Sequence, residues 1–223
     1  MKTAEKTAIV LGATGLVGGI LLDLLLADTR YKKVILFSRR SVNKDNPKIT
    51  EHICDLLALK TKKEHFKADE VFCCLGSTNA KTPNKKRYKE IDYGIPIAAA
   101  ELCKSNRIPT LIVVSALGAD ATSNIFYSRI KGEMEDEVLE IDIPKTHIVQ
   151  PSMIGGHRDE KRPREYVSKK LMSALNFLFL GPLKKYRVIH PKTIALAMQW
   201  LANNDFDKKR ILSDELKEIV KNG

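Results

Sequence analysis

The stretch VLGATGLVGG, residues 10–19, decides the fold of this chain. It follows an apolar run at 7–12 that predicts a buried strand, and it leads into a leucine-rich run at 18–28 that predicts a helix. Its glycines have the spacing G-x-x-G-x-x-G. Glycine allows a tight turn in which the backbone can approach a phosphate, and the N–H groups at a helix N-terminus bind anions. A strand-to-helix turn without a ligand is the alternative. The residues expected in this phosphate-binding turn are Gly12, Thr14, Gly15, Leu16, Val17 and Gly18.

Short β-branched runs alternate with helical patterns along the rest of the chain. Further strands are expected at 33–39, 53–57, 70–76, 110–116 and 145–152, and further helices at 93–106 and 123–141, the last with Ser123 or Asn124 as N-cap. This alternation predicts an α/β fold, namely a Rossmann-like doubly wound parallel sheet. We expect a single domain over residues 1–223. Residues 1–152 would form its cofactor-binding core, and 153–223 a small helical and loop lobe on the substrate side.

The end of the second expected strand indicates which dinucleotide would bind. An Asp or Glu there would accept a hydrogen bond from the ribose 2′-OH of NAD. The sequence has FSRR at 37–40 instead, with Ser38, Arg39 and Arg40. There is no acid to repel a 2′-phosphate, and there are two guanidinium groups to hold it. We therefore expect NADP(H) in preference to NAD(H). Arginines that only face solvent at the strand end are the alternative.

The stretch FYSRIKGE, residues 126–133, places Tyr127 and Lys131 four residues apart. On a helix these side chains share one face, which is also common for an ordinary polar surface. Ser115 ends the fifth expected strand, and ligands of doubly wound sheets bind outside the carboxyl ends of the strands. The glycine turn and the order of these parts favour a Ser-Tyr-Lys site. Gly132, which would cost about 1 kcal/mol inside a helix, suggests that another backbone or a ligand approaches closely.

Taken in order, these parts resemble the short-chain dehydrogenase/reductase superfamily. The chain is similar, more narrowly, to the atypical family of the HIV Tat-interacting protein, also called oxidoreductase. The segments that carry this similarity are FCCLGST at 72–78, AAELCK at 99–104, SALGADATSNIFYSRIKGEME at 115–135 and QPSMIGGHRDEKRPREY at 150–166. The resemblance implies an NADP(H)-dependent oxidoreductase that transfers a hydride between the nicotinamide and a small carbonyl or alcohol substrate.

The resemblance also implies a role for each site residue. Tyr127 would be the general acid, Lys131 would lower its pKa and bind the nicotinamide ribose, and Ser115 would polarise the substrate carbonyl. The other cofactor contacts that it implies are Asp55 and Leu56 at the adenine, Leu75, Gly76 and Ser77 at the adenosine ribose, and Pro151, Ser152 and Ile154 at the nicotinamide. Two positions depart from the pattern. Gln150 stands where many relatives have arginine, and Asp92 stands where many superfamily members have a proton-relay asparagine, a role that we do not carry over.

Composition sets the remaining expectations. The 223 residues include 38 Lys and Arg against 27 Asp and Glu, a net charge of +11, but the basic residues are spread out and we expect no nucleic-acid partner. The 4 cysteines form no C-x-x-C pair, so no metal site is expected. The N-terminus is no signal peptide and no apolar run spans a membrane, which leads us to expect a cytoplasmic monomer or homodimer. A non-catalytic protein that binds NADPH as a sensor is the alternative to the enzyme.

Overall fold

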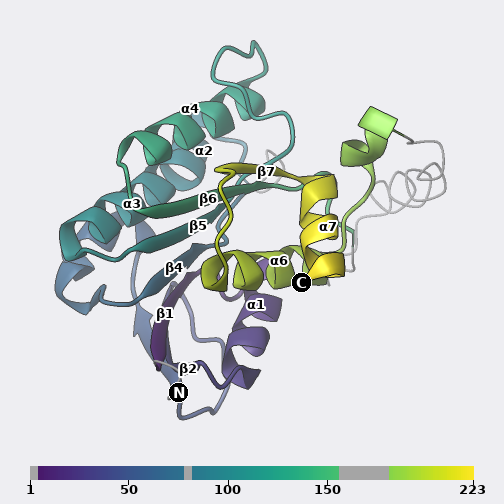
Figure 1. Cartoon of the computed structure of the whole chain (residues 1–223). Helices are drawn as coiled ribbons and strands as arrows, with labels where there is room; N and C mark the ends of the chain where they lie inside the picture. Colours follow the sequence, from purple (N-terminus) through teal and green to yellow (C-terminus); the bar gives the residue numbers. More distant parts are fainter. Residues whose placement is uncertain (1–4, 78–81, 156–180) are drawn as a thin grey trace.

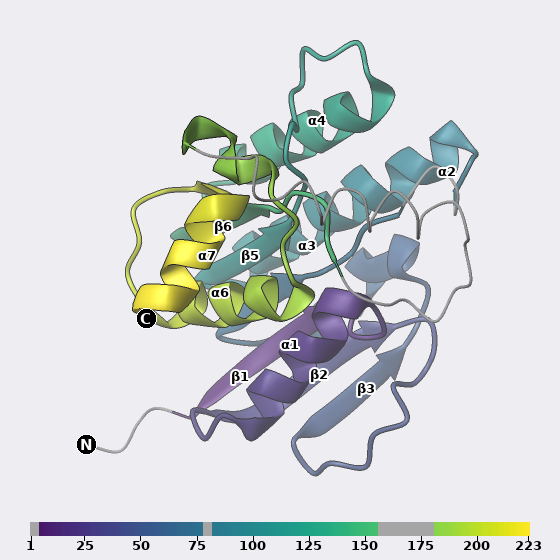
Figure 2. The same ribbon diagram turned by 90° about the vertical axis from the view of Figure 1, so that its right-hand side faces the viewer.

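The computed structural model describes residues 5–77, 82–155 and 181–223, which form a twisted parallel sheet with helices on both faces (Figures 1 and 2). Its seven strands lie in the order β3-β2-β1-β4-β5-β6-β7, and every neighbouring pair is parallel. The prediction of a Rossmann-like doubly wound sheet is confirmed. The strands are β1 (Lys6–Leu11), β2 (Tyr31–Ser38), β3 (Ile49–Ile53), β4 (Glu70–Cys73), β5 (Thr110–Val114), β6 (Lys145–Gln150) and β7 (Arg210–Leu212).

Alternate residues of the strands face two separate cores. Ala8 and Val10 of β1 pack into the core under α1, α6 and α7, whereas Ile9 and Leu11 pack into the core under η1, α3 and α4. This alternation follows from the period of two in a strand, and it explains why a strand buried on both faces is apolar throughout. The helices are α1 (Leu16–Ala27), η1 (Leu56–His65), α2 (Lys85–Lys89), η2 (Glu90–Gly94), α3 (Ile95–Asn106), α4 (Phe126–Glu140), η4 (Gly181–Tyr186), α6 (Pro191–Asn203) and α7 (Ser213–Asn222).

The third strand was predicted at the wrong place. The sequence predicts a strand at 53–57, but β3 ends at Ile53. Asp55 is instead the N-cap of the 3₁₀ helix η1, where its carboxylate accepts a hydrogen bond from the N–H of Leu57 at 3.1 Å. A short apolar run does not distinguish a strand from a helical turn, and the capping side chain of Asp55 favours the turn.

The long helix α4 begins later than predicted. It starts at Phe126 rather than near Ser123, and neither Ser123 nor Asn124 is its N-cap, a position that Ile125 occupies. The segment 115–125 folds back onto α4, with the N–H of Asp120 donating to the carbonyl of Ser128 at 3.0 Å. A Cβ at Gly132 would collide with the backbone of this segment. The close approach predicted at Gly132 is confirmed, and the neighbour is a backbone.

The C-terminal segment contributes to the same sheet and core. The three-residue strand β7, which the sequence did not indicate, completes the sheet next to β6. Helices α6 and α7 pack into the core around α1. The division of the chain at residue 152 stays a prediction, and residues 156–180 of the expected lobe lie outside the described residues. Among the described helices, none is both long enough and apolar enough to cross a bilayer.

Candidate cofactor and active site

The glycine turn between β1 and α1 has a geometry that only glycine can provide. Gly12 has φ +86°, and a Cβ there would lie 2.9 Å from the carbonyl oxygen of Cys74. A Cβ at Gly18 would collide with the carbonyl of Gly12. Among the described residues, no side chain caps α1 and its first turn contains no acid. The positive end of this helix is therefore open to an anion.

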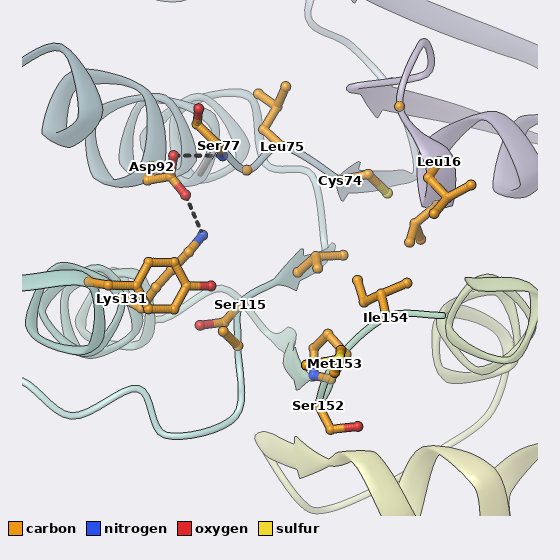
Figure 3. Close-up of a pocket in the computed structure, with 17 residues that line it drawn as sticks. Leu16, Cys74, Leu75, Ser77, Asp92, Ser115, Lys131, Ser152, Met153 and Ile154 are labelled. Carbon is orange, nitrogen blue, oxygen red and sulfur yellow. Dashed lines mark hydrogen bonds and ion pairs between the residues drawn. The ribbon is translucent and has the colours of Figure 1, made fainter. Parts of the chain in front are cut away.

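A cavity of about 450 Å³ lies beside this turn, at the carboxyl ends of β4, β5 and β6 (Figure 3). The strand order reverses between β1 and β4, which is where doubly wound sheets bind their ligands. The predicted residues that line the cavity are Gly15, Leu16, Val17, Leu75, Gly76, Ser77, Ser115, Tyr127, Lys131, Pro151, Ser152 and Ile154. Met153, within the predicted stretch 151–154, also lines the cavity, and four further lining residues were not assigned to the site from the sequence, namely Cys74, Asp92, Val114 and Ala116.

The remaining predicted residues do not line this cavity. They lie at the glycine turn and at or after the ends of β2 and β3, and they are Gly12, Thr14, Gly18, Ser38, Arg39, Arg40, Asp55 and Leu56. Ser38 is buried and donates its hydroxyl to the carbonyl of Arg40 at 2.7 Å. Arg39 and Arg40 are exposed, and neither forms an ion pair within the described part of the chain. Their guanidinium groups are therefore free of carboxylates at the strand end where the sequence predicts a 2′-phosphate.

Ser115 follows β5 directly and has a buried hydroxyl. Its N–H donates to the carbonyl of Val149 at 2.8 Å, which fixes the backbone against β6. The side chain is 6% exposed, and its Oγ has no hydrogen-bond partner among the described residues. A buried hydroxyl without a partner is costly and uncommon in a folded protein. Because this oxygen belongs to a cavity-lining residue, a bound ligand would satisfy it.

Lys131 and Asp92 form a buried ion pair in the cavity wall. Lys131 Nζ lies 2.9 Å from Asp92 Oδ1, with the two side chains 3% and 0% exposed. Asp92 Oδ2 also accepts the N–H of Ser77 at 2.8 Å (Figure 3). Burial alone would lower the pKa of Lys131, but the charge of Asp92, assisted by Tyr127, raises it. The lysine of the predicted site is therefore held as a cation.

Tyr127 has a higher pKa than a free phenol. Burial raises the pKa of Tyr127, Lys131 offsets this in part, and the negative charge of Asp92 adds to the increase. The sequence predicts a pKa lowered by Lys131, so the expected net direction is wrong. The main reason is burial, which disfavours the phenolate more than the charge of Lys131 stabilises it, and the charge of Asp92 adds to the increase. The ring of Tyr127 packs edge-on against Tyr88 of α2, with the ring centroids 6.2 Å apart.

Gln150 points away from the cavity and into a buried polar cluster. Its side-chain amide donates to both carboxylate oxygens of Glu135, at 2.9 and 2.8 Å. Arg210 of β7 supplies the guanidinium for the same carboxylate, at 2.8 Å. Gln150 therefore contributes to the packing between α4 and the sheet, and it is not among the lining residues of the cavity.

Comparison with known proteins identifies the family. Protein FMP52-1, mitochondrial, of Scheffersomyces stipitis is 34% identical over 185 residues, which cover 80% of this chain and 76% of that protein. Protein HTATIP2 of Rattus norvegicus is 29% identical over 178 residues, which cover 78% of this chain and 73% of that protein. The chain belongs to the atypical short-chain dehydrogenase/reductase family that includes the FMP52 and HTATIP2 proteins. The resemblance predicted from the sequence is confirmed.

Two further comparisons agree with a dinucleotide-binding Rossmann-like fold. A family model described as semialdehyde dehydrogenase, NAD binding domain, matches residues 7–97. The structure of a UDP-N-acetylglucosamine 4-epimerase from Methanobrevibacter ruminantium in complex with UDP-N-acetylmuramic acid superposes with a TM-score of 0.70 at 20% identity, covering 96% of this chain and 81% of that chain. At this identity the likeness concerns the fold. This member of the family has an NAD(P)-binding domain with an oxidoreductase-like fold.

The expectation of a cytoplasmic location is contradicted by the names of these relatives. The proteins of Scheffersomyces stipitis, Candida glabrata, Debaryomyces hansenii and Candida albicans are all named mitochondrial. The expectation used only the lack of a secretory signal pattern and of an apolar span. Neither property distinguishes the cytoplasm from the mitochondrion, whose targeting segments are amphipathic and rich in arginine and serine.

Proposed function

We propose that this protein is an NADP(H)-dependent oxidoreductase that transfers a hydride between the nicotinamide and a small carbonyl or alcohol substrate. The observation that carries the proposal is one cavity lined both by the first turn of α1 and by Ser115, Tyr127 and Lys131. The open N-terminus of α1, the glycine turn and the unpartnered Ser115 hydroxyl fit a dinucleotide with a substrate beside it.

Each of the three side chains has a distinct role in this proposal. When bound, the cofactor supplies the hydride. Ser115 donates its hydroxyl proton in a hydrogen bond to the carbonyl oxygen of the substrate, and Tyr127 donates its phenolic proton to the alkoxide that develops there. Lys131 stabilises the phenolate that remains and binds the ribose hydroxyls of the cofactor. The raised pKa of Tyr127 keeps it protonated at neutral pH, which suits reduction of a carbonyl more than oxidation of an alcohol.

The walls around these groups favour a small substrate with an apolar body. Val114, Ala116, Met153 and Ile154 line the cavity beside Ser115. The formal charges among the described lining residues are those of Lys131 and Asp92, which form the ion pair. We propose aldehydes, ketones and quinones as the first compounds to test.

Turnover is tested by following NADPH absorbance with this panel of carbonyl compounds. We expect at least one compound to support NADPH oxidation by the wild-type protein. With the variant Ser115→Ala, no compound should be reduced at a rate comparable to that of the wild type. Tight NADPH binding by the wild-type protein without turnover on any compound would contradict the enzyme and favour the second candidate.

The second candidate is a non-catalytic protein that binds NADPH and reports its level through partner contacts. One observation favours it: burial raises the pKa of Tyr127 by more than Lys131 lowers it, and Asp92 adds to the increase, so the phenol is not activated by a lowered pKa. A pull-down in which the bound partners change with NADPH would support this candidate. The protein's oligomeric state, monomer or homodimer, and the lack of a nucleic-acid partner stay predictions.

A further inference from the structure

Lys131 keeps its charge in a place where burial disfavours charge. Its side chain is 3% exposed, and in the described part of the chain its one ion-pair partner is Asp92. A lysine buried without a partner loses its proton near neutral pH, because desolvation penalises the ammonium form. Asp92 is therefore the group that compensates for the burial of Lys131.

The carboxylate of Asp92 is itself held from several elements. It lies in η2, a π-helical segment between α2 and α3, and a π turn places a side chain where a regular helix would not. The N–H of Ser77, after β4, donates to Oδ2 at 2.8 Å. A Cβ at Gly76 would lie 3.8 Å from Asp92 Oδ1 and 3.9 Å from Lys131 Nζ, so residue 76 lies next to the ion pair.

We propose that Asp92 is a positioning residue of the site, which keeps Lys131 protonated and holds its ammonium in the wall of the cavity where NADP(H) would bind. The identity of the ligand rests on the proposed function, but the effect of Asp92 on the protonation and position of Lys131 does not depend on it. The role differs from that of a relay asparagine, because Asp92 acts through its charge and contacts Lys131 directly.

The other titratable groups that face the pair stay neutral around neutral pH. They are Tyr88 of α2, Tyr127 of α4 and Cys73 of β4. Burial raises the pKa of all three, that of Cys73 to about 11. Burial is the largest single influence on the pKa of Lys131 and lowers it, and the Asp92 carboxylate is the main group that opposes this effect.

The variant Asp92→Asn removes the charge and keeps an oxygen that can accept the N–H of Ser77. Glu90→Gln is the matched control, since it removes another carboxylate from the same η2 helix. The ion-pair partner of the Glu90 carboxylate is Arg87, 3.2 Å away. We would measure the Kd for NADPH from pH 6 to pH 9. The Kd of Asp92→Asn relative to wild type should rise about tenfold over this range as Lys131 loses its proton, and that of Glu90→Gln should stay constant. In Asp92→Asn/Lys131→Arg the rise should disappear, because a guanidinium keeps its charge.

A second measurement needs no ligand. The folded-state pKa of Lys131 in Asp92→Asn would lie below its unfolded value, so the folded variant binds fewer protons than the unfolded chain and its stability increases with pH. The urea midpoint of Asp92→Asn should therefore rise from pH 6 to pH 9 relative to wild type, while that of Glu90→Gln runs parallel to wild type. A parallel curve for Asp92→Asn would overturn the proposal even if wild type binds NADPH. No NADPH binding by wild type, with the pH-dependent midpoint present, would overturn the proposed function alone.

Discussion

At each of the two ends of the parallel strands, a lysine, a carboxylate and a tyrosine lie together. At the amino ends of the strands, Lys6, Glu70 and Tyr31 lie together, and Glu70 accepts from both neighbours at 2.5 Å. At the carboxyl ends, Lys131 pairs with Asp92 and Tyr127 lies nearby. Identical chemical types therefore stand in two environments within one fold.

The difference lies in which polar groups are satisfied. Tyr31 donates to Glu70 and accepts from the side-chain amide of Asn203 at 2.7 Å, so its phenol is fully used. Within the described residues, the phenol of Tyr127 has no such partner, and neither has the hydroxyl of Ser115. A closed network stabilises the fold, whereas polar groups left open in a cavity are available to a ligand.

The largest expected effect is on turnover. Tyr127→Phe removes the proposed proton donor and should lower kcat for NADPH oxidation by about 10²–10⁴-fold, the usual contribution of a general acid. The Kd for NADPH should change little, since the ring remains. Tyr31→Phe is the matched control and should keep its turnover. Equal losses of kcat in both variants would mean that the groups at the amino and carboxyl ends of the strands do not differ in function.

The next effect is on stability. Glu70→Gln weakens hydrogen bonds to a charged group that is 2% exposed, and it should lower the free energy of unfolding by about 1.5–3 kcal/mol. Urea unfolding at pH 7 would measure this, and NADPH affinity should be unchanged in the folded variant. A loss of NADPH affinity with unchanged stability would show that the group at the amino ends of the strands also contributes to NADPH binding.

A smaller effect is expected at the end of β2. Arg39→Ala removes one exposed guanidinium from the proposed 2′-phosphate site and should weaken NADPH binding by about tenfold, in the range of one hydrogen bond to a charged group. NADH binding should be unaffected, and Lys33→Ala, an exposed cation earlier on the same strand, serves as the control. Equal wild-type dissociation constants for NADPH and NADH would contradict the cofactor preference.

The smallest effect concerns pH and stability away from the cavity. Burial lowers the pKa of His147 in β6, whose Nδ1 lies 3.0 Å from the carbonyl oxygen of Lys208. Its folded-state pKa lies below the unfolded value of about 6.5, so its contribution to stability is present above that pH and decreases as the pH falls. Unfolding midpoints from pH 5 to pH 8 should therefore decline less toward acid in His147→Gln than in wild type. Identical slopes would show that His147 is not the group responsible.

The parts of the fold that follow from local patterns could be predicted from the sequence. The glycine turn, its strand and α1 are adjacent in the chain, and the apolar runs of β4, β5 and β6 mark strands buried on both faces. The three-residue β7 could not be predicted, because it forms only by pairing with β6, more than fifty residues earlier in the chain.

The candidate site shows the same limit. Ser115 and Leu75 were predictable because residues after the strands of a parallel sheet meet at one edge. Asp92 was noticed but not assigned, because its contact with Lys131 depends on the π-helical register of η2 and on a residue 39 positions away. The direction of the Tyr127 pKa could not be predicted either, because it depends mainly on how deeply this side chain is buried.

The most direct test of the account uses NADPH that carries deuterium at the transferable position of its nicotinamide. The wild-type protein is incubated with a carbonyl compound from the panel, and the alcohol product is analysed by mass spectrometry. The account predicts one deuterium in each alcohol molecule formed, with Tyr127→Phe forming almost none. An unlabelled product, or tight NADPH binding with no product from any compound, would contradict it.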